Sequence, residues 1–434
     1  MKEVQDFVAK LDNEGERSMT EGPYKLPEGW QWVKLGEVCQ HRTGIWGPEA
    51  SDPAQGFPIV RSTEIEGFRI RPQGASIRVV RTTQVEAYKL ESGDILVSKS
   101  SGSPHLVGWP AIFEDPKDGK VYLFSNFMLR LRSDRRRLEP WFLLYYLHSP
   151  IARSVYLGAQ DTTSGLRNLR VREFLAQPIP LPPLEEQKRI VARIEELMGR
   201  VREARRLREE AKQEAERLWQ AVLAQTFPRP GSELPEGWQW VRLEKVARVF
   251  SGSPAPQDKR YFEGGVFPFV RVQDLGRYGI TTNLLETAHK VNEKAVKELR
   301  LVQAKSGTIL FPKSGAAILT NTRAILGEDA YIVSHLAGIE PKRDALENLW
   351  AFYWLCTVDM AQYIDNPAYP SLRLSKIKQI LIPLPPLEEQ KRIVAHLQEV
   401  QEKIKALKEA QDQTEEKLKR LEQAILNKAF RGEL

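Results

Sequence analysis

The chain has 434 residues, 41% of them hydrophobic, which is enough for two to four domains that each bury an ordinary core. Uninterrupted apolar runs such as 350–356 are too short to span a membrane, and the N-terminus lacks the apolar segment of a signal peptide, so we expect a soluble, cytoplasmic protein that contacts no membrane. The net charge of +7 favours an anionic partner, and the excess lies in two stretches, with 21 basic against 17 acidic residues in 21–184 and 20 against 16 in 228–387.

Comparison of the sequence with itself shows an internal duplication. The octapeptide LPEGWQWV occupies 26–33 and returns unchanged at 234–241, and the fourteen residues IPLPPLEEQKRIVA occupy 179–192 and return at 382–395. Weaker similarity lies between these anchors, in the pairs 57–65 and 267–275, 92–100 and 306–314, and 141–147 and 349–355. The chain is therefore two copies of one unit.

In chain order, the duplication predicts five parts. They are an N-terminal extension at 1–20, a globular domain at 21–184, a long helix at 185–227, a second globular domain at 228–387, and a second long helix with the C-terminus at 388–434. Each globular domain has short apolar runs bounded by Gly, Pro and Asp, which predict strands, and one longer apolar segment, 139–157 or 346–364, which predicts a helix. This mixture indicates an α+β domain.

The two long helices are predicted from their boundaries. A Pro-Pro pair stands directly before each, carboxylates occupy the first turn, and no proline interrupts the next 43 residues. At ~1.5 Å per residue, each helix would be about 64 Å long. Both helices are close to neutral, with ten basic against nine acidic residues in 185–227 and nine against nine in 388–430.

A heptad pattern runs along both helices and predicts a coiled-coil seam. The apolar seam positions are Ile190, Ile194, Leu197, Val201, Leu218, Val222, Ile393, Leu397, Val400, Ile404, Leu407, Leu418, Leu421 and Ile425. Because the second globular domain follows the first helix at once, the second helix can fold back along the first. We expect an antiparallel pair within one chain that separates two domains related by a pseudo-two-fold axis, although a seam between two chains stays open.

Four segments resemble parts of three catalytic motifs, and each is incomplete. Asn366-Pro367-Ala368-Tyr369 lacks the second proline of an amino-methyltransferase turn, and the Lys99-Ser100 and Lys313-Ser314 segments lack the glycine of a phosphate-binding loop. We interpret 186–188, which resembles a nuclease Glu-x-Lys, as solvated charge on an exposed helical turn.

The remaining reactive side chains are scattered. The six His lie at His41, His105, His148, His289, His335 and His396, with no metal-ligand spacing. Cys39 and Cys356 stand in different copies, so we expect buried thiols rather than a disulfide or a metal site. The sequence predicts no catalytic residues and no metal.

Polar residues recur at matched positions of the two globular domains and suit DNA. Arg and Gln read purine edges, Asp or Glu accepts from cytosine, and Lys and Ser hold phosphates. The matched residues are Arg61, Ser62, Glu64, Lys99, Ser100 and Ser101 in the first copy, and Arg271, Gln273, Asp274, Lys313 and Ser314 in the second.

With both IPLPPLEEQKRIVA anchors, both LPEGW segments and the paired long helices, the chain resembles the specificity subunit of type I restriction-modification systems over about 20–434. The resemblance implies that each globular domain is a target recognition domain for one half of a bipartite, asymmetric DNA site, and that the coiled coil fixes the spacer. By analogy, the loops at 160–168 and 366–373 are further contact segments. The additional candidate residues are Arg42, Thr43, Thr162, Arg167, Asn321, Tyr369 and Arg373.

In that family the subunit has no catalysis of its own. The resemblance implies that it recruits two methyltransferase subunits, that two restriction subunits join for cleavage, and that S-adenosylmethionine, ATP and magnesium belong to those partners, so that this chain binds no cofactor. Two alternatives remain: a tandem coiled-coil scaffold that binds proteins but no nucleic acid, and a self-sufficient methyltransferase. Salt-dependent duplex binding would separate the first from the DNA interpretation, and methyl transfer by this chain alone would support the second.

Overall fold

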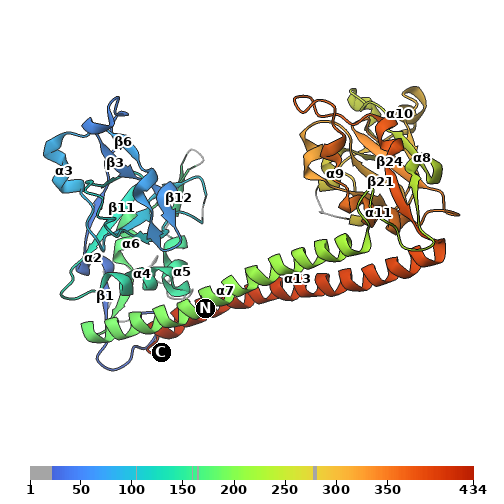
Figure 1. Cartoon of the computed structure of the whole chain (residues 1–434). Coiled ribbons are helices and arrows are strands. Elements are labelled where there is room, and N and C mark those ends of the chain that lie inside the picture. The colour runs from blue at the N-terminus through green and yellow to red at the C-terminus, as the bar shows by residue number, and fades with distance from the viewer. Residues whose placement is uncertain (1–21, 104, 159, 164–165, 277–280) are drawn as a thin grey trace. The chain divides into compact units, whose positions relative to one another are not determined.

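The computed structural model describes residues 22–103, 105–158, 160–163, 166–276 and 281–434 (Figure 1). The predicted extension at 1–20 lies outside the described residues. The chain forms two compact units: unit 1 holds the residues up to Leu207 together with Gln413–Leu434, and unit 2 is Arg208–Asp412. Each unit therefore contains one globular domain, part of the first long helix and part of the second.

Unit 1 contains short strands and short helices around a mixed sheet. Its strands are β1 (Gln31–Lys34), β2 (Cys39–Thr43), β3 (Phe57–Val60), β4 (Ile65–Glu66), β5 (Arg69–Ile70), β6 (Ser76–Arg78), β7 (Ile95–Ser98), β8 (Ser100–Ser101), β9 (Pro110–Ile112), β10 (Leu123–Phe124), β11 (Met128–Ser133), β12 (Gln160–Thr163), β13 (Leu166–Leu169) and β14 (Pro178–Leu181). Its globular helices are α2 (Leu35–Val38), α3 (Thr82–Tyr88), α4 (Pro140–His148), α5 (Pro150–Gly158) and α6 (Val171–Ala176), with 3-10 turns η1 (Pro53–Gln55), η2 (Ser62–Glu64) and η3 (Pro72–Gly74). The main sheet has the order β2-β11-β7-β9-β5-β4, and smaller sheets have the orders β10-β3-β6, β12-β13-β8 and β1-β14.

Unit 2 repeats this arrangement with different loops. Its strands are β15 (Gln239–Arg242), β16 (Ala247–Ser251), β17 (Phe267–Val270), β18 (Thr281–Leu284), β19 (Lys290–Val291), β20 (Gln303–Ala304), β21 (Ile309–Pro312), β22 (Ala324–Leu326), β23 (Ala330–Ile332), β24 (Leu336–Pro341) and β25 (Leu381–Leu384). Its globular helices are α8 (Leu243–Val246), α9 (Val272–Gly276), α10 (Glu293–Glu298), α11 (Asn348–Thr357) and α12 (Leu374–Gln379), with 3-10 turns η4 (Lys259–Tyr261), η5 (Ala316–Thr320) and η6 (Met360–Tyr363). The sheet orders are β16-β24-β21-β22-β18, β19-β17-β23-β20 and β15-β25, so the predicted α+β class is confirmed.

The apolar helix of each domain is shorter than the sequence predicts. The segment 139–157 is divided into α4 and α5 at Ser149, because Pro150 supplies no backbone N–H and disfavours helical geometry in the residue before it. The segment 346–364 is likewise divided into α11 and η6. Both α4 and α11 are buried along nearly their whole length in the main core of their unit, which explains why they lack a polar face.

The two sequence anchors meet in each unit, although about 150 residues separate them. Strand β1, from the first LPEGWQWV, pairs antiparallel with β14, which leads into the first Pro-Pro pair. Strand β15 pairs with β25 in the same way: Gln31 faces Leu181, and Gln239 faces Leu384. The identical peptides therefore build the ribbon that joins each globular domain to the start of a long helix.

A buried glutamine fixes each of these joints. Gln187 is fully buried, accepts from the Glu139 backbone N–H at 2.9 Å, and donates to the carbonyls of Arg137 at 2.8 Å and Pro182 at 2.9 Å. Gln390 accepts from the Glu347 N–H at 2.9 Å and makes the equivalent pair of donations. The side chains of Glu186 and Lys188, which the sequence analysis interprets as solvated charge, are 31 and 55% exposed. Gln187 between them is buried, because its amide satisfies backbone groups that would otherwise be buried without partners.

The long helices are α7 (Leu184–Thr226) and α13 (Leu387–Phe430), one residue from the predicted starts at 185 and 388. They run antiparallel within each unit. In unit 1, Arg189 donates to the Leu434 carbonyl at 3.1 Å and Arg205 binds Glu422 at 2.7 Å. In unit 2, Lys212 contacts Asp412 at 2.6 Å, and Glu216, one turn later, contacts Lys408 at 2.7 Å.

The buried stripe of the helices departs from a strict heptad. Leu218, Leu407 and Leu421 are 54, 40 and 47% exposed, so their assignment to the seam is wrong. A helix of 3.6 residues per turn drifts against a seven-residue repeat, and towards its ends each helix packs on a globular domain rather than on its partner helix alone. The residues that are buried instead are Met198, Trp219, Leu223, Val394 and Leu426.

The remaining seam positions lie in the cores of the two units. Those that are buried are Ile190, Ile194, Val201, Leu397, Leu418 and Ile425, and those that are partly buried are Leu197, Val222, Ile393, Val400 and Ile404. No helix in the described part of the chain is long and apolar enough to cross a membrane.

The beginning of the described chain packs on its end within unit 1. The Tyr24 hydroxyl donates to the Phe430 carbonyl at 2.6 Å, and Arg431 lies over the Tyr24 ring at 5.4 Å. Gly432, with a positive φ of 76°, leaves no room for a side chain beside Pro27. The last residues of α13 are thereby attached to the segment that precedes β1.

Candidate nucleic-acid interface

Arg61 and Arg271 begin the same kind of turn in the two units, directly after β3 and β17. In unit 1 the Arg61 backbone N–H donates to Glu64 Oε2 at 2.6 Å, and the guanidinium lies 3.2 Å from Oε1 of that carboxylate. In unit 2 the Arg271 N–H donates to Asp274 Oδ2 at 2.8 Å. The matched Arg-x-x-acid spacing is therefore the sequence signature of one turn, which sets the position of an arginine at the end of a strand.

The carboxylates of these turns face inward. Glu64 is 8% exposed and also accepts from the Thr63 hydroxyl at 2.6 Å, and Asp274 is 2% exposed and also accepts from the Ala288 N–H at 3.1 Å. The expectation that Glu64 and Asp274 accept from cytosine is therefore replaced by a structural role. In contrast, Ser62 and Gln273, which lie within the turns, are exposed.

The guanidinium groups of the turn arginines are only partly satisfied. Arg61 pairs with Glu64, whereas Arg271 lies over the rings of Phe262 at 5.5 Å and Phe269 at 5.8 Å. The Nε atom of each arginine is buried and has no hydrogen-bond partner among the described residues. Because these Nε atoms are closed to solvent, any further hydrogen bond from Arg61 or Arg271 to a ligand would have to come from the terminal guanidinium nitrogens.

In unit 1 the lysine segment and the loop at 160–168 form one small sheet. Ser100 and Ser101 make up β8, which pairs with β13 so that Ser101 faces Arg167, and the Ser100 hydroxyl donates to Asn168 Oδ1 at 2.6 Å. Strand β13 pairs in turn with β12, where Thr162 faces Arg167. The Thr162 side chain and residues 164–165 lie outside the described part of the chain.

In unit 2 the segment 366–373 takes the same place beside the lysine. The Leu372 N–H donates to the Lys313 carbonyl at 2.8 Å, as the Leu169 N–H does to the Lys99 carbonyl. Ser314 is bridged to Ser371, and Tyr369 is 80% exposed. The two loops that the resemblance pointed to therefore lie at equivalent positions in the two units.

A short turn connects the arginine to the lysine in each unit. In unit 1, Ser125 N–H donates to the Val60 carbonyl at 2.9 Å, and Lys99 N–H donates to the Phe127 carbonyl at 2.8 Å. In unit 2, the Val333 N–H donates to the Val270 carbonyl at 3.0 Å, and the Lys313 N–H donates to the backbone carbonyl of His335 at 2.9 Å. Residues from three distant segments thus converge at one edge of each domain. We refer to these two sites as the basic edges.

The remaining candidates of unit 1 lie on β2, at the side of the main sheet. Thr43 pairs with Leu129 near the start of β11, so it lies towards the same end of the sheet as Lys99. Arg42 is exposed and lies over the Tyr88 ring at 5.4 Å.

Two candidates of unit 2 are engaged within the protein. Arg373 lies 3.1 Å from Asp365, although its side chain is 73% exposed. Asn321 has a left-handed backbone, φ 53°, and its Oδ1 accepts from the Arg323 guanidinium at 2.5 Å. Only the amide NH₂ of Asn321 is left to act as a donor.

Arg323 is a residue that the sequence analysis missed. It is 1% exposed, and its guanidinium also donates to the carbonyls of Thr322 at 2.9 Å and Val358 at 3.2 Å. Burial lowers the pKa of Arg323 to about 10, because desolvation disfavours the charged form. This buried cation holds the Asn321 loop in place, and nothing in the local sequence distinguishes it from an exposed arginine.

The described residues contain no group of three or more His, Cys, Asp or Glu side chains that could hold a metal ion. Cys39 is buried, and burial raises its pKa to about 12, whereas Cys356 is at intermediate depth.

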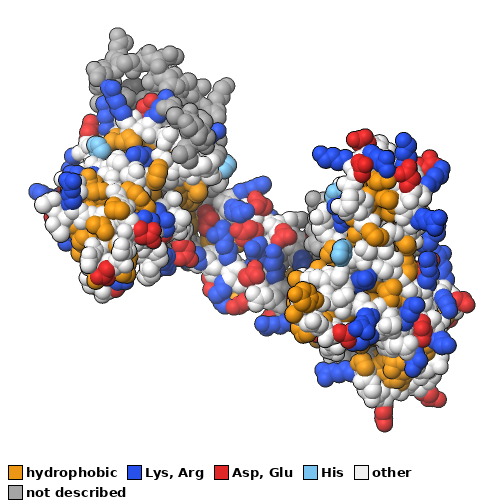
Figure 2. All heavy atoms as spheres, turned by 90° about the horizontal axis from the view of Figure 1, so that it is seen from above, with side chains coloured by type: hydrophobic (Ala, Val, Ile, Leu, Met, Phe, Trp, Pro, Cys, Tyr) orange, Lys and Arg blue, Asp and Glu red, His pale blue; other side chains and the backbone are white. Residues whose placement is uncertain are grey.

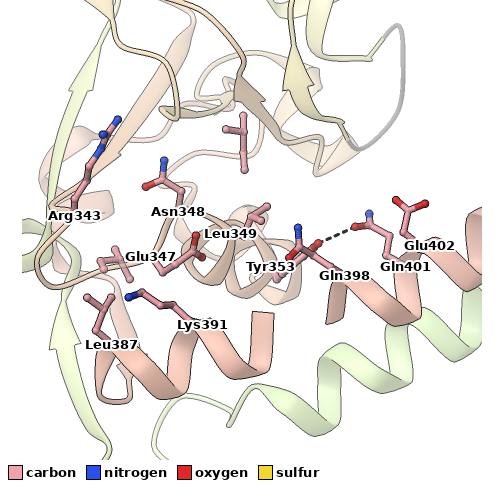
Figure 3. Close-up of a pocket in the computed structure, with 12 residues that line it drawn as sticks. Arg343, Glu347, Asn348, Leu349, Tyr353, Leu387, Lys391, Gln398, Gln401 and Glu402 are labelled. Atoms are coloured by element: carbon pink, nitrogen blue, oxygen red, sulfur yellow. Dashed lines mark hydrogen bonds between the residues drawn. The ribbon is translucent and has the colours of Figure 1, made fainter. Parts of the chain in front are cut away.

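A cavity of about 600 Å³ in unit 2 lies between α11 and the first turns of α13 (Figure 3). Tyr353 points across it and donates to Gln401 Oε1 at 2.7 Å. None of the candidate DNA-contacting residues lines this cavity. In unit 1 the corresponding helix carries Trp141, whose ring packs 5.7 Å from that of Tyr145.

The surface charge follows the sequence pattern. Figure 2 shows Lys and Arg, Asp and Glu, and exposed hydrophobic side chains interspersed on the globular parts of both units, and both signs of charge side by side on the long helices. On α7 and α13 many charges are paired within one helix, for example Lys188 with Glu185 and Lys391 with Glu388, both at 2.7 Å. The long helices therefore lack the excess of positive charge that binding to DNA phosphates requires.

These features define a class of protein: a duplicated chain with two recognition domains of the same fold, each with its own basic edge, on a shared pair of antiparallel helices. The comparisons with known proteins agree with this class. The model of the type I restriction modification DNA specificity domain matches twice, at residues 27–213 and 235–416. The chain therefore belongs to the family of type I restriction-modification specificity subunits.

Individual relatives match along almost the whole chain. The putative type I restriction enzyme MjaX specificity subunit of Methanocaldococcus jannaschii is 25% identical over 94% of this chain and 95% of its own length. The HsdS subunit of Thermoanaerobacter tengcongensis is 35% identical, with a TM-score of 0.60 and coverage of 96% of this chain and 100% of that one. A chain from a structural study of assembly and conformational transition in the type I system is 33% identical, with a TM-score of 0.74, over 95% of this chain and all of that chain.

Specificity subunits are non-catalytic, and the partner subunits of the system carry out the catalytic work. This agrees with the prediction that the chain is not an enzyme.

Proposed function

We propose that each unit recognises one half of a bipartite, asymmetric DNA site through its basic edge, and that the paired helices set the length of the spacer between the half-sites. The observation that carries this proposal is the matched geometry of Arg61 with Lys99 and of Arg271 with Lys313. The backbone positions are the same in both copies, but the side chains around them differ. An asymmetric DNA target has two half-sites of different sequence, and two sites with the same backbone geometry but different side chains would suit it.

The long helices support a second part of the proposal, which is that they bind protein partners. They are close to neutral, and their entrances are identical in the two copies, including the buried Gln187 and Gln390. Two identical entrances fit two copies of one partner. We infer that these partners are two methyltransferase subunits, that two restriction subunits join for cleavage, and that S-adenosylmethionine, ATP and magnesium are bound by those subunits and not by this chain.

The DNA part of the proposal is tested by the dependence of duplex binding on salt. The chain is purified with its methyltransferase partner, and the equilibrium affinity for duplex DNA is measured over a series of salt concentrations. We expect Lys99→Ala and Lys313→Ala each to lower the slope of log affinity against log salt by about one, because each removes one phosphate contact. The matched controls are Lys120→Ala and Lys297→Ala, at exposed lysines outside the basic edges, and they should leave the slope unchanged.

A complex that retains duplex DNA without any salt dependence, or that retains none, would contradict the proposal. The chain would then be better described as a tandem scaffold for proteins.

A further inference from the structure

Phe127 and His335 occupy the same position in the two units. Each is the third residue of a four-residue turn between two strands, which is closed by the bond from Met128 N–H to the Ser125 carbonyl at 2.8 Å in unit 1. The corresponding bond in unit 2, from Leu336 to Val333, is 3.0 Å long. The two turns are 208 residues apart, which is also the offset of the sequence pair 141–147 and 349–355, and their matching hydrogen bonds show that they correspond.

The turn lies between the two cationic side chains of each basic edge. Its first residue bonds to the residue before Arg61 or Arg271, and the carbonyl of its third residue accepts from Lys99 or Lys313. The third residue is therefore placed between an arginine and a lysine that are fixed through the same backbone.

Both third residues are exposed, although neither is a residue that a turn requires. Phe127 is 51% exposed, in a domain that buries most of its other phenyl rings. The imidazole of His335 is exposed, and its Nδ1 lies 2.5 Å from the Ser314 hydroxyl oxygen. That contact orients the ring and leaves Nε2 without a partner among the described residues. An oriented side chain in the middle of a cationic surface is suited to a ligand contact rather than to the core.

We propose that Phe127 and His335 are specificity-determining residues that meet base edges at the centre of their half-sites. This inference rests on the proposed DNA recognition. The phenyl ring of Phe127 offers apolar contact, which favours a thymine methyl group, and the His335 ring offers a hydrogen-bonding nitrogen. The same backbone position therefore carries an apolar side chain in unit 1 and a polar side chain in unit 2, so the two half-sites differ at the equivalent base pair.

The test selects bound duplexes from a pool with randomised sequence, using the complex of the chain with its methyltransferase partner. Wild type, Phe127→Ala, His335→Ala and the exchange variants Phe127→His and His335→Phe are compared. We expect each alanine variant to lose preference, by roughly 5- to 150-fold, at one or two adjacent base pairs of one half-site, while the other half-site and the spacer stay unchanged. Each exchange variant should acquire a new preference at the same base pairs.

The controls are Val79→Ala in unit 1 and Leu299→Ala in unit 2, which truncate exposed apolar side chains outside the basic edges and should leave the selected sequence unchanged. Thermal unfolding of each variant confirms that the fold is intact. If the wild-type complex selects a sequence and the Phe127 and His335 variants select the same one, this inference is wrong and the proposed function stands. If the wild-type complex selects no sequence, the proposed function itself fails.

Discussion

His148 shows how the core of unit 1 controls the charge of a single residue. Its ring is buried between aromatic neighbours, 4.2 Å from Phe68 and 4.9 Å from Trp109, and its Nε2 lies 2.9 Å from the Pro110 carbonyl. Burial lowers the pKa of His148 to about 3, since the imidazolium would lose its hydration there. The folded protein therefore holds this histidine neutral at physiological pH.

This burial predicts a dependence of stability on pH. The folded pKa lies below that of the unfolded chain, so the unfolded state takes up the proton first as the pH falls. Stability is unaffected by His148 above pH 6.5 and decreases as the pH falls from 6.5 towards 3. Between pH 6.5 and 5 we expect the free energy of unfolding of unit 1 to fall by about 2 kcal/mol more in wild type than in His148→Phe, as measured by urea unfolding.

The control is His41→Gln, at an exposed histidine of the same unit, which should keep the wild-type dependence. Equal pH dependence in wild type and His148→Phe would show that folding does not lower the pKa of His148.

At the scale of elements, the long helices were the most predictable part of the chain. The Pro-Pro pairs and the uninterrupted periodicity place both starts within one residue, because these signals are local. The buried stripe was less predictable. Its path depends on where each helix leaves its partner and packs on a globular domain, as Trp219 does beside Tyr353, with the ring centroids 5.6 Å apart.

The neighbouring residues Leu218 and Trp219 provide a direct test of that path. Trp219→Ala removes a side chain that is 7% exposed, and we expect it to lower the free energy of unfolding of unit 2 by about 3 to 5 kcal/mol. Leu218→Ala, at a position 54% exposed, should change it by less than about 0.5 kcal/mol. Denaturant unfolding measures both changes. A larger loss of unfolding free energy for Leu218→Ala than for Trp219→Ala would show that the buried stripe follows the strict heptad.

The candidate site was predictable only in part, for the same physical reason. The sequence identified Lys99, Lys313 and the turn arginines by their recurrence, but it could not show that Glu64 and Asp274 point inward, because capping geometry depends on the turn that forms. It also could not show that Phe127 and His335 lie between the arginine and the lysine of their unit. That placement depends on hydrogen bonds between segments that are distant in the sequence, and local propensity carries no information about such bonds.

At the scale of the molecule, the duplication separates a constant framework from variable edges. A deletion of seven residues around Arg208 together with seven around Gln411 should remove about two turns from each helix, or about 10 Å. Under the proposed function, the selected DNA spacer should shorten by about three base pairs, given ~3.4 Å of rise per base pair.

Selection from randomised duplexes measures both half-sites and the spacer together. The half-site sequences should not change, and a deletion in α7 alone should impair assembly, because it shifts one helix against the other. Altered half-sites in the double deletion would contradict the role of the helices as a spacer.

The hydrogen bond from Tyr24 to Phe430 joins the beginning of the described chain to the end of α13 within unit 1. The segment 228–233 joins the end of α7 to the second LPEGWQWV through peptide bonds, whereas the end of α13 contacts the first LPEGWQWV and the residues before it without a covalent link. A chain that begins at Leu234, with Leu434 linked to Gly22 and the break at 228–233, should therefore fold and select the same DNA sequence. If it does, the fold does not depend on which of the two copies comes first in the chain.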